Sequence, residues 1–321
     1  MNERAQVQST LVTGSSGFIG RVLTARLRGL GERVIGFDCT PDPSTAVDRF
    51  VLGDIEDPHR LHAALKGERV ASIVHLGGLS GPMLSGDDPY RMMRINVMGT
   101  ANVLEAARVA GVNRVVFLSS IMAYGPCSTD LTVGEDLPLN AADAYGSSKV
   151  AGEAMMRAYA REHGLDTVSL SVSNVYGPGR RTHCLINLMV ADALAGKRTE
   201  IDYGRGWCRQ YIHVDDAVQA VIQVLAHPRL PQPAYNITGG IHVLLDDVGQ
   251  IISRILPQAD IRLGDKLHPF DYPIGPLDIT AARRDFDYTP SVSLEDGIAK
   301  HIEEYKRIHH LPDMTEAVLN S

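Results

Sequence analysis

Tyr145 and Lys149 are the residues whose types and spacing most directly suggest chemistry. They lie four positions apart in a segment whose apolar spacing predicts a helix, so one helical face presents a phenol and an ammonium together. A neighbouring positive charge lowers the pKa of a tyrosine, which is ordinarily about 10. Tyr145 could then take a proton from an alcohol while the hydroxyl of Ser120 stabilises the oxygen charge. The alternative is a solvated surface pair, the commoner role of an isolated Tyr-x-x-x-Lys.

A turn with three glycines follows the first predicted strand. Gly14 permits a tight bend, Gly17 lets the backbone approach a pyrophosphate, and Gly20 allows close packing of helix on strand. Amide groups at the start of the following helix would face the phosphates. The turn therefore predicts a dinucleotide cradle, although a strand-to-helix turn without a ligand is the alternative on this motif alone.

Two acidic residues end the next two predicted strands, which span 33–38 and 49–54. Asp38 could bind the hydroxyls of an adenosine ribose, and Cys39 follows it where an arginine would favour a 2′-phosphate. This favours NAD over NADP, whereas the alternative for Asp38 is a solvated strand end. Asp54 and Ile55 stand where an adenine could meet a carboxylate and an apolar face.

The order of predicted elements favours one fold class. Strands over 72–78 and 114–120 alternate with a short helix over 61–65, a long amphipathic helix over 88–110 and another over 146–163. Strands that alternate with helices predict an α/β fold with a Rossmann-type, doubly wound parallel sheet. Ligands of such sheets lie at the carboxyl ends of the strands, where Ser120 and the small residues Gly77 and Gly78 stand. Asn96 interrupts the long helix.

Composition excludes several function classes. The chain has 321 residues and a net charge of −7, which offers nucleic acid or an anionic membrane no general attraction. No continuous apolar stretch is long enough to span a membrane, and the start of the chain lacks a secretion signal, so we expect a cytoplasmic protein. The four cysteines are far apart, which predicts reduced thiols and no metal site.

Five motifs resemble, in order, the landmarks of extended short-chain dehydrogenase/reductases, and the likeness covers nearly the whole chain. It is closest to the nucleotide-sugar epimerase and dehydratase group, and UDP-glucose 4-epimerases are the nearest type. The motifs are Thr13-Gly-Ser-Ser-Gly-Phe-Ile-Gly20, Ser119-Ser-Ile-Met-Ala-Tyr-Gly125, Tyr145-Gly-Ser-Ser-Lys149, Asn174-Val-Tyr-Gly-Pro178 and Arg209-Gln-Tyr-Ile-His-Val-Asp-Asp216.

The resemblance implies a role for each matching position. The catalytic residues would be Ser120, Tyr145 and Lys149. The NAD-binding residues would be Gly14, Gly17, Phe18, Ile19, Gly20, Asp38, Asp54, Ile55, Leu76, Gly77, Gly78, Asn96, Tyr145, Lys149 and Val172. The substrate would contact Ser80, Ser120, Met122, Asn174, Asn187, Tyr203, Arg209 and His268.

The residues after Ser120 select among the reactions of the group. Its 4,6-dehydratases carry an acidic pair directly after this hydroxyl, and its decarboxylating members carry a glutamate two positions before the tyrosine that is Tyr124 here. Here Ile121 and Met122 occupy those places, and neither can act as an acid or a base. This favours epimerisation of a nucleoside-diphosphate sugar, at C4, through a transient ketone. The alternatives are an NAD-dependent dehydrogenase of a free sugar, sugar acid or other small alcohol, and a catalytically silent binding protein.

The expected division of the chain places an NAD-binding domain at 1–175 and 212–243 and a substrate-binding lobe at 176–211 and 244–321. Three positions depart from the family pattern: His268 stands in place of a second phosphate arginine, Ser171 in place of another arginine, and Gln210 in place of an aspartate. These departures weaken the case for a nucleotide-linked substrate. Other arginines that could substitute are Arg180, Arg181 and Arg205.

Helices 88–110 and 146–163 carry more methionines and alanines than one sheet face requires. Members of the resembled group commonly pair these helices into a four-helix bundle, so we expect a homodimer. The alternative is that all these side chains belong to the core of one chain.

Overall fold

The computed structural model describes residues 8–84, 86–182, 184–268 and 271–310, and its largest element is a parallel sheet of seven strands. The strands lie in the order β10-β6-β5-β4-β1-β2-β3, and every neighbouring pair is parallel. Their bounds are β1 (Ser9–Thr13), β2 (Arg33–Asp38), β3 (Arg49–Leu52), β4 (Val70–His75), β5 (Arg114–Ser120), β6 (Asp166–Val172) and β10 (Ala234–Ile237).

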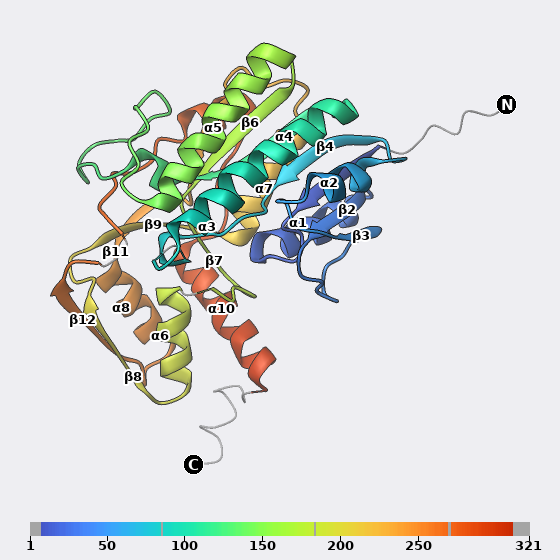
Figure 1. The fold of residues 1–321 in the computed structure, drawn as a ribbon. Coiled ribbons are helices and arrows are strands. Elements are labelled where there is room, and N and C mark those ends of the chain that lie inside the picture. Colours follow the sequence, from blue (N-terminus) through green and yellow to red (C-terminus); the bar gives the residue numbers. More distant parts are fainter. Residues whose placement is uncertain (1–7, 85, 183, 269–270, 311–321) are drawn as a thin grey trace.

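Helices cover both faces of this sheet (Figure 1). Successive residues of one strand enter different cores, since Leu11 and Val115 belong to one cluster, and Val12 and Val116 to the other. The first core receives α2 (Pro58–Leu65), α4 (Gly99–Ala110) and α5 (Ala144–His163), and the second receives α1 (Phe18–Gly29), α7 (Val214–Ala226) and α9 (Thr280–Phe286). The predicted Rossmann-type, doubly wound fold is confirmed.

The helix predicted over 88–110 consists of three consecutive helical parts. They are α3 (Pro89–Met93), a π-helical turn η2 (Arg94–Met98) and α4. Asn96, which was expected to interrupt the helix, lies buried in the π-turn, and the Thr100 hydroxyl donates to its carbonyl oxygen at 2.6 Å. A π-turn offsets the helix face locally and is frequent at functional sites.

Helix α5 begins two residues earlier than predicted. The carboxylate of Asp143 caps it by accepting a hydrogen bond from the Gly146 amide at 2.9 Å, and Gly164 ends it with φ of +69°. Tyr145 and Lys149 therefore lie in the first turns of α5, beside the carboxyl end of β5. Short 3₁₀ turns η1 (Pro82–Leu84) and η3 (Ile121–Tyr124) complete this region.

A smaller unit is built from short sheets and three helices at one end of the molecule (Figure 1). One sheet has the order β11-β9-β7 and another pairs β12 with β8. The elements are β7 (Asn174–Tyr176), β8 (Arg198–Tyr203), β9 (Cys208–His213), β11 (Ile241–Leu244), β12 (Asp260–Lys266), α6 (Leu185–Leu194), α8 (Leu245–Ile255) and α10 (Leu294–His309). The described part of the chain holds no helix with the length and apolarity needed to cross a membrane.

One domain boundary differs from the sequence expectation. The boundary expected at residue 212 falls inside β9, which pairs with β11 and β7 and not with the large sheet. His213 is the N-cap of the next helix, α7, and Asp215 and Asp216 lie in its first turn. The Asp216 carboxylate accepts the amides of Ser291 and Val292, which fixes the segment before α10.

Candidate active site

The glycine turn adopts a conformation that side chains would block. Gly14 has φ of +69°, and a Cβ there would lie 2.8 Å from the Gly77 nitrogen. A Cβ on Gly20 would lie 2.1 Å from the Gly14 oxygen, far inside any permitted contact. The hydroxyls of Ser15 and Ser16 in the same turn are buried without a hydrogen-bond partner. The turn is tight, lies at the start of a helix and carries hydroxyls without partners, so it fits a pyrophosphate.

Asp38 joins this turn to the end of β2. Its carboxylate accepts the amide of Ser16 at 2.9 Å and the amide of Thr40 at 3.0 Å. A carboxylate has about four acceptor positions, so two remain for a pair of ribose hydroxyls. Ile55 is buried between Gly77 and Gly99, where its side chain forms an apolar wall next to the turn.

Tyr145 is buried and lies beside two serine hydroxyls. Burial raises the pKa of its phenol, and hydrogen bonding with Ser120 and Ser80 offsets part of this shift. In the protein alone, the net direction is therefore upward, whereas the sequence predicts that a neighbouring positive charge lowers this pKa. The carboxylate of Asp143 adds to the upward shift. The structure thus brings Tyr145, Ser120 and Ser80 together at the carboxyl edge of the sheet.

Lys149 lies one helical turn from Tyr145. Its Nζ donates to the Leu118 carbonyl at 2.8 Å and lies over the Tyr145 ring, 5.7 Å from the centroid. Burial lowers the pKa of Lys149 to about 8, and the negative charge of Glu153 opposes this shift. The ammonium is therefore close to the phenol but anchored on the backbone of β5.

Asn96 is fully engaged with protein groups. Its Oδ1 accepts the Leu79 amide at 2.8 Å, and its Nδ2 lies 3.0 Å from both the Leu79 carbonyl and the Ser148 hydroxyl. The Ser148 hydroxyl in turn donates to the Tyr145 carbonyl at 2.7 Å. Asn96 therefore ties the loop that carries Ser80 to the helix that carries Tyr145, a role that its sequence position does not reveal.

Two further residues of this region, Glu153 and Tyr272, were not predicted from the sequence. The carboxylate of Glu153 is buried beneath β5 and accepts a hydrogen bond from Ser119 at 2.5 Å. Its spacing of four from Lys149 on α5 was the available signal. The Tyr272 hydroxyl lies 2.9 Å from the Met122 carbonyl and 2.8 Å from the Asp143 carboxylate, and no local pattern indicates this contact.

A second group of expected residues gathers around Arg209. The guanidinium forms an ion pair with the carboxylate of Asp271, and both side chains are mostly buried. Burial raises the pKa of Asp271, and the charge of Arg209 opposes that shift. The rings of Tyr203 and His268 meet edge to face with centroids 4.4 Å apart. The charge of Arg209 also acts on the Tyr203 phenol, so Tyr203, Arg209 and His268 lie in one neighbourhood, but the charge of Arg209 is already neutralised by Asp271.

Gln210 explains one departure from the family pattern. Its Nε2 donates to the Gly275 carbonyl and its Oε1 accepts the Leu277 amide, each at 2.8 Å. A carboxylate could only accept, so an aspartate would leave the Gly275 carbonyl without its donor. The amide therefore fastens segment 275–277 to β9.

The other expected substrate residues have protein partners of their own. The Asn174 amide donates to the Gln210 carbonyl at 3.1 Å, and the Asn187 side chain lies 3.1 Å from Nε2 of His301 on α10. Met122 is buried in the cluster that holds Tyr145, and Val172 is buried opposite Ser120 in the β5–β6 register. The structure thus turns the Asn187 side chain toward α10.

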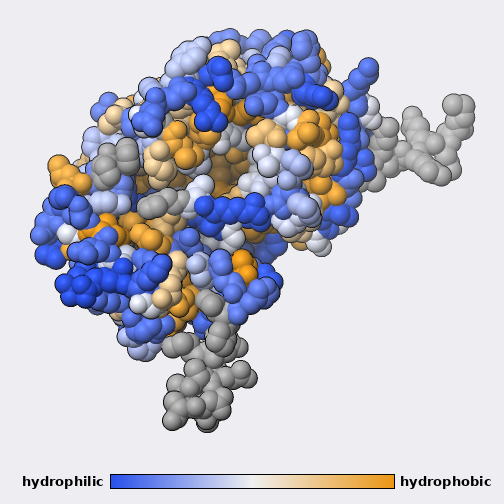
Figure 2. Space-filling view, turned by 60° about the horizontal axis from the view of Figure 1, so that its bottom comes forward, coloured by the Kyte–Doolittle hydropathy of each residue, from blue (hydrophilic) through white to orange (hydrophobic). Residues whose placement is uncertain are grey.

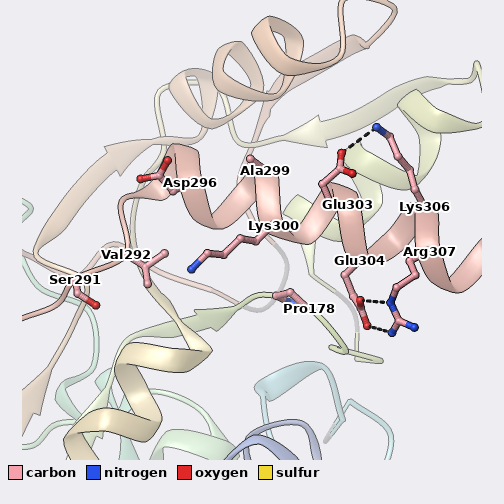
Figure 3. A pocket seen from close by; sticks show the side chains of 10 residues that line it. All are labelled: Pro178, Ser291, Val292, Asp296, Ala299, Lys300, Glu303, Glu304, Lys306 and Arg307. Atoms are coloured by element: carbon pink, nitrogen blue, oxygen red, sulfur yellow. Dashed lines mark hydrogen bonds and ion pairs between the residues drawn. The ribbon is translucent and has the colours of Figure 1, made fainter. Parts of the chain in front are cut away.

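The molecular surface is hollowed near the middle of one face, and the hollow has an apolar floor (Figure 2). An open groove of about 1120 Å³ runs along α10 and is lined in part by Pro178, Val292 and Lys300 (Figure 3). Its acids Glu303 and Glu304 pair with Lys306 and Arg307 on the same helix. Among the described residues, no group of three histidine, cysteine or acidic side chains could hold a metal ion.

Together, the parallel sheet, the glycine turn and the Tyr145–Lys149 helix define a dinucleotide-binding enzyme of the short-chain dehydrogenase/reductase class. The chain belongs to the NAD dependent epimerase/dehydratase family, whose sequence model matches residues 10–238. The resemblance to extended members of the class is confirmed. The chain is therefore an NAD-dependent enzyme.

Two relatives that match to a similar extent have different assigned reactions. A UDP-glucose 4-epimerase from Mycolicibacterium smegmatis is 31% identical over 315 residues, which cover 92% of this chain and 98% of the relative. A dTDP-glucose 4,6-dehydratase from Streptomyces niveus is 31% identical over 317 residues, which cover 92% of each chain. Sequence similarity alone therefore leaves the reaction open between epimerisation and dehydration.

Solved structures show the same fold. MoeE5 in complex with UDP-glucuronic acid and NAD has a TM-score of 0.86 and 29% identity, covering 94% of this chain and 99% of MoeE5. DesIV, a dTDP-glucose 4,6-dehydratase from Streptomyces venezuelae with NAD bound, has a TM-score of 0.84 and 32% identity, covering 94% of this chain and 98% of DesIV. The cradle fits the NAD that both neighbours carry.

Proposed function

We propose that the protein is an NAD-dependent epimerase of a nucleoside-diphosphate sugar that inverts C4 through a transient keto-sugar. The observation that carries the proposal is the group of Tyr145, Ser120 and Ser80 beside the glycine cradle, followed by Ile121 and Met122. Both of these apolar side chains are buried, so no acid or base directly follows Ser120 for the removal of water. Relatives that act on UDP-glucose and UDP-glucuronate as 4-epimerases support the substrate class.

Each residue has a defined task in this proposal. Tyr145 takes the proton of the sugar hydroxyl, and Ser120 donates a hydrogen bond to the oxygen as its charge develops. Lys149 holds positive charge near the phenol and would hold the nicotinamide ribose. Bound NAD would supply the hydride acceptor and donor for the sugar carbon. After the keto-sugar has turned, so that hydride would reach its opposite face, the same tyrosine returns its proton to the carbonyl oxygen.

A second candidate is an NAD-dependent dehydrogenase of a free sugar, sugar acid or other small alcohol, with net release of NADH. The pairing of Arg209 with Asp271 favours it, because a neutralised guanidinium attracts a diphosphate less strongly than a free one. His268, in place of a second arginine, has the same consequence. The two functions share the residues around Tyr145 and differ in what the lobe recognises.

One experiment separates these functions. The purified protein is incubated with NAD and UDP-glucose, UDP-glucuronic acid, dTDP-glucose or the corresponding free sugars. Absorbance at 340 nm reports NADH, and proton NMR reports the sugar products. Interconversion of C4 isomers without accumulated NADH supports the epimerase, whereas stoichiometric NADH rejects it in favour of the dehydrogenase. A 4-keto-6-deoxy sugar would overturn the inference drawn from Ile121 and Met122.

We also propose that the protein is a homodimer through 88–110 and 146–163. Tyr90, Met98 and Val109, which lie along α3, η2 and α4, are exposed large hydrophobic side chains that a partner chain would cover. Light scattering at micromolar concentration should give twice the mass of one chain. A monomer would refute the pairing. Location in the cytoplasm stays a prediction from the sequence.

A further inference from the structure

Three segments that are far apart in the sequence meet next to the glycine turn. Nη2 of Arg21, in the first turn of α1, donates to the Gly179 carbonyl in the loop after β7 at 2.8 Å. Asp42, in the loop between β2 and β3, pairs with Arg181 of that same loop at 2.9 Å. Nη1 of Arg21 lies 3.4 Å from the Ser44 hydroxyl and 3.8 Å from the Asp42 carboxylate. The three segments are thus linked side chain to side chain.

These contacts lie at the carboxyl edge of the parallel sheet. Arg21 directly follows Gly20, and Asp42 comes four residues after Asp38. Asp38 itself binds the glycine turn through the Ser16 amide. In such folds a dinucleotide lies across this edge of the sheet. A link between these loops therefore crosses the path along which the bound dinucleotide must leave. We propose that Arg21, Asp42 and Arg181 form a clasp that retains NAD.

The inner members of the clasp are well held. The side chains of Arg21 and Asp42 are 18% and 10% exposed, and the Asp42 carboxylate also accepts the amide and hydroxyl of Ser44 at 2.8 and 2.6 Å. These hydrogen bonds, together with Arg181, lower the pKa of Asp42 to about 2, so it remains charged in neutral solution. Nε of Arg21 and the hydroxyl of Thr45 are buried without partners, which leaves donors in the clasp for cofactor oxygens.

Arg181 is the outer and weaker member. Its side chain is 72% exposed, and an exposed ion pair contributes little by itself. Arg181 matters because it joins the loop after β7 to the Asp42 carboxylate, which other groups already hold in place. The inference rests on NAD binding, which family membership establishes, and is independent of the substrate and of the proposed epimerase.

The test measures cofactor release directly. Protein loaded with the fluorescent analogue nicotinamide ethenoadenine dinucleotide is mixed with excess NAD in a stopped-flow instrument, and the dissociation rate is recorded. Asp42→Asn and Arg21→Gln should each release the analogue about three- to tenfold faster, and Arg181→Gln about twofold faster. Raising the salt concentration should accelerate release from the wild type more than from Asp42→Asn.

The matched control is Arg198→Gln, which breaks an ion pair with Asp260 in the sheet formed by β8 and β12. This variant should release the analogue at the wild-type rate. Thermal unfolding identifies any variant that has lost its fold. If Asp42→Asn or Arg21→Gln does not fold, Arg181→Gln still tests the clasp, because the Arg181 side chain is exposed. Unchanged release from folded Asp42→Asn and Arg181→Gln overturns the clasp, as does equal acceleration in Arg198→Gln.

Discussion

Glu153 lies one helical turn beyond Lys149, and its buried carboxylate opposes the loss of the lysine proton. The carboxylate is held by the Ser119 hydroxyl and by Arg157, whose side chain is half exposed. Burial would otherwise favour the neutral amine. A negative charge that plays no part in the reaction itself thus maintains the positive charge beside the phenol of Tyr145.

Glu153→Gln should therefore change the pH dependence of the enzyme. Without the negative charge the pKa of Lys149 falls below about 8, so the ammonium is lost at lower pH and the alkaline decline in kcat moves to lower pH. The groups near Lys149 that also carry or acquire charge are Glu153, Tyr145, Tyr124 and His75. The pH profile of kcat measures the shift.

Arg157→Gln is the control for this prediction, because it removes the exposed partner and keeps the carboxylate. Its profile should match that of the wild type. If Glu153→Gln lowers thermal stability but leaves the profile in place, the carboxylate is only structural.

Tyr145→Phe should abolish most of the turnover and leave NAD binding nearly unchanged. The substitution removes the proton acceptor and retains a ring of the same shape, and general acid–base groups contribute about 10²- to 10⁴-fold. Turnover with the sugar substrate and the Kd for NAD are measured on the same preparation. Undiminished turnover would show that another group is the base.

Asn96→Ala should destabilise the protein and slow catalysis together. It leaves the Leu79 amide and carbonyl without their partner, and each buried unsatisfied group costs about 1–3 kcal/mol. The loop that carries Ser80 is then no longer tied to α5. Urea unfolding and kcat are the measurements, and Asn102→Ala, which removes a single bond to the Ile55 carbonyl, is the milder comparison. Equal losses in the two variants would contradict the linking role of Asn96.

Gly20→Ala should prevent NAD binding or folding, because its Cβ would lie 2.1 Å from the Gly14 oxygen. Gly29→Ala, at the other end of the same helix, has open space around the added atom and should be neutral or slightly stabilising. Circular dichroism and calorimetric titration with NAD distinguish the two. Normal NAD affinity in Gly20→Ala would contradict the described geometry of the turn.

Local patterns predicted the fold and the centre of the site. The spacing of Gly14, Gly17 and Gly20 and the Tyr145–Lys149 pair are properties of one turn and one helix, so the sequence contains them directly. The sequence could not predict the raised pKa of Tyr145, because the shift depends on how deeply the phenol is buried. The ion pair between Arg209 and Asp271 joins positions 62 residues apart, which no periodicity specifies.

The chain passes repeatedly between its two parts. It leaves the seven-stranded sheet after β6, returns through α7 and β10, departs again at β11, comes back at α9 and then forms α10 in the smaller unit. Neither part is a continuous length of polypeptide, so no single cut in the backbone would release one intact. The smaller unit consequently cannot be exchanged for another as one continuous segment; it has to be altered by substitutions within a shared scaffold.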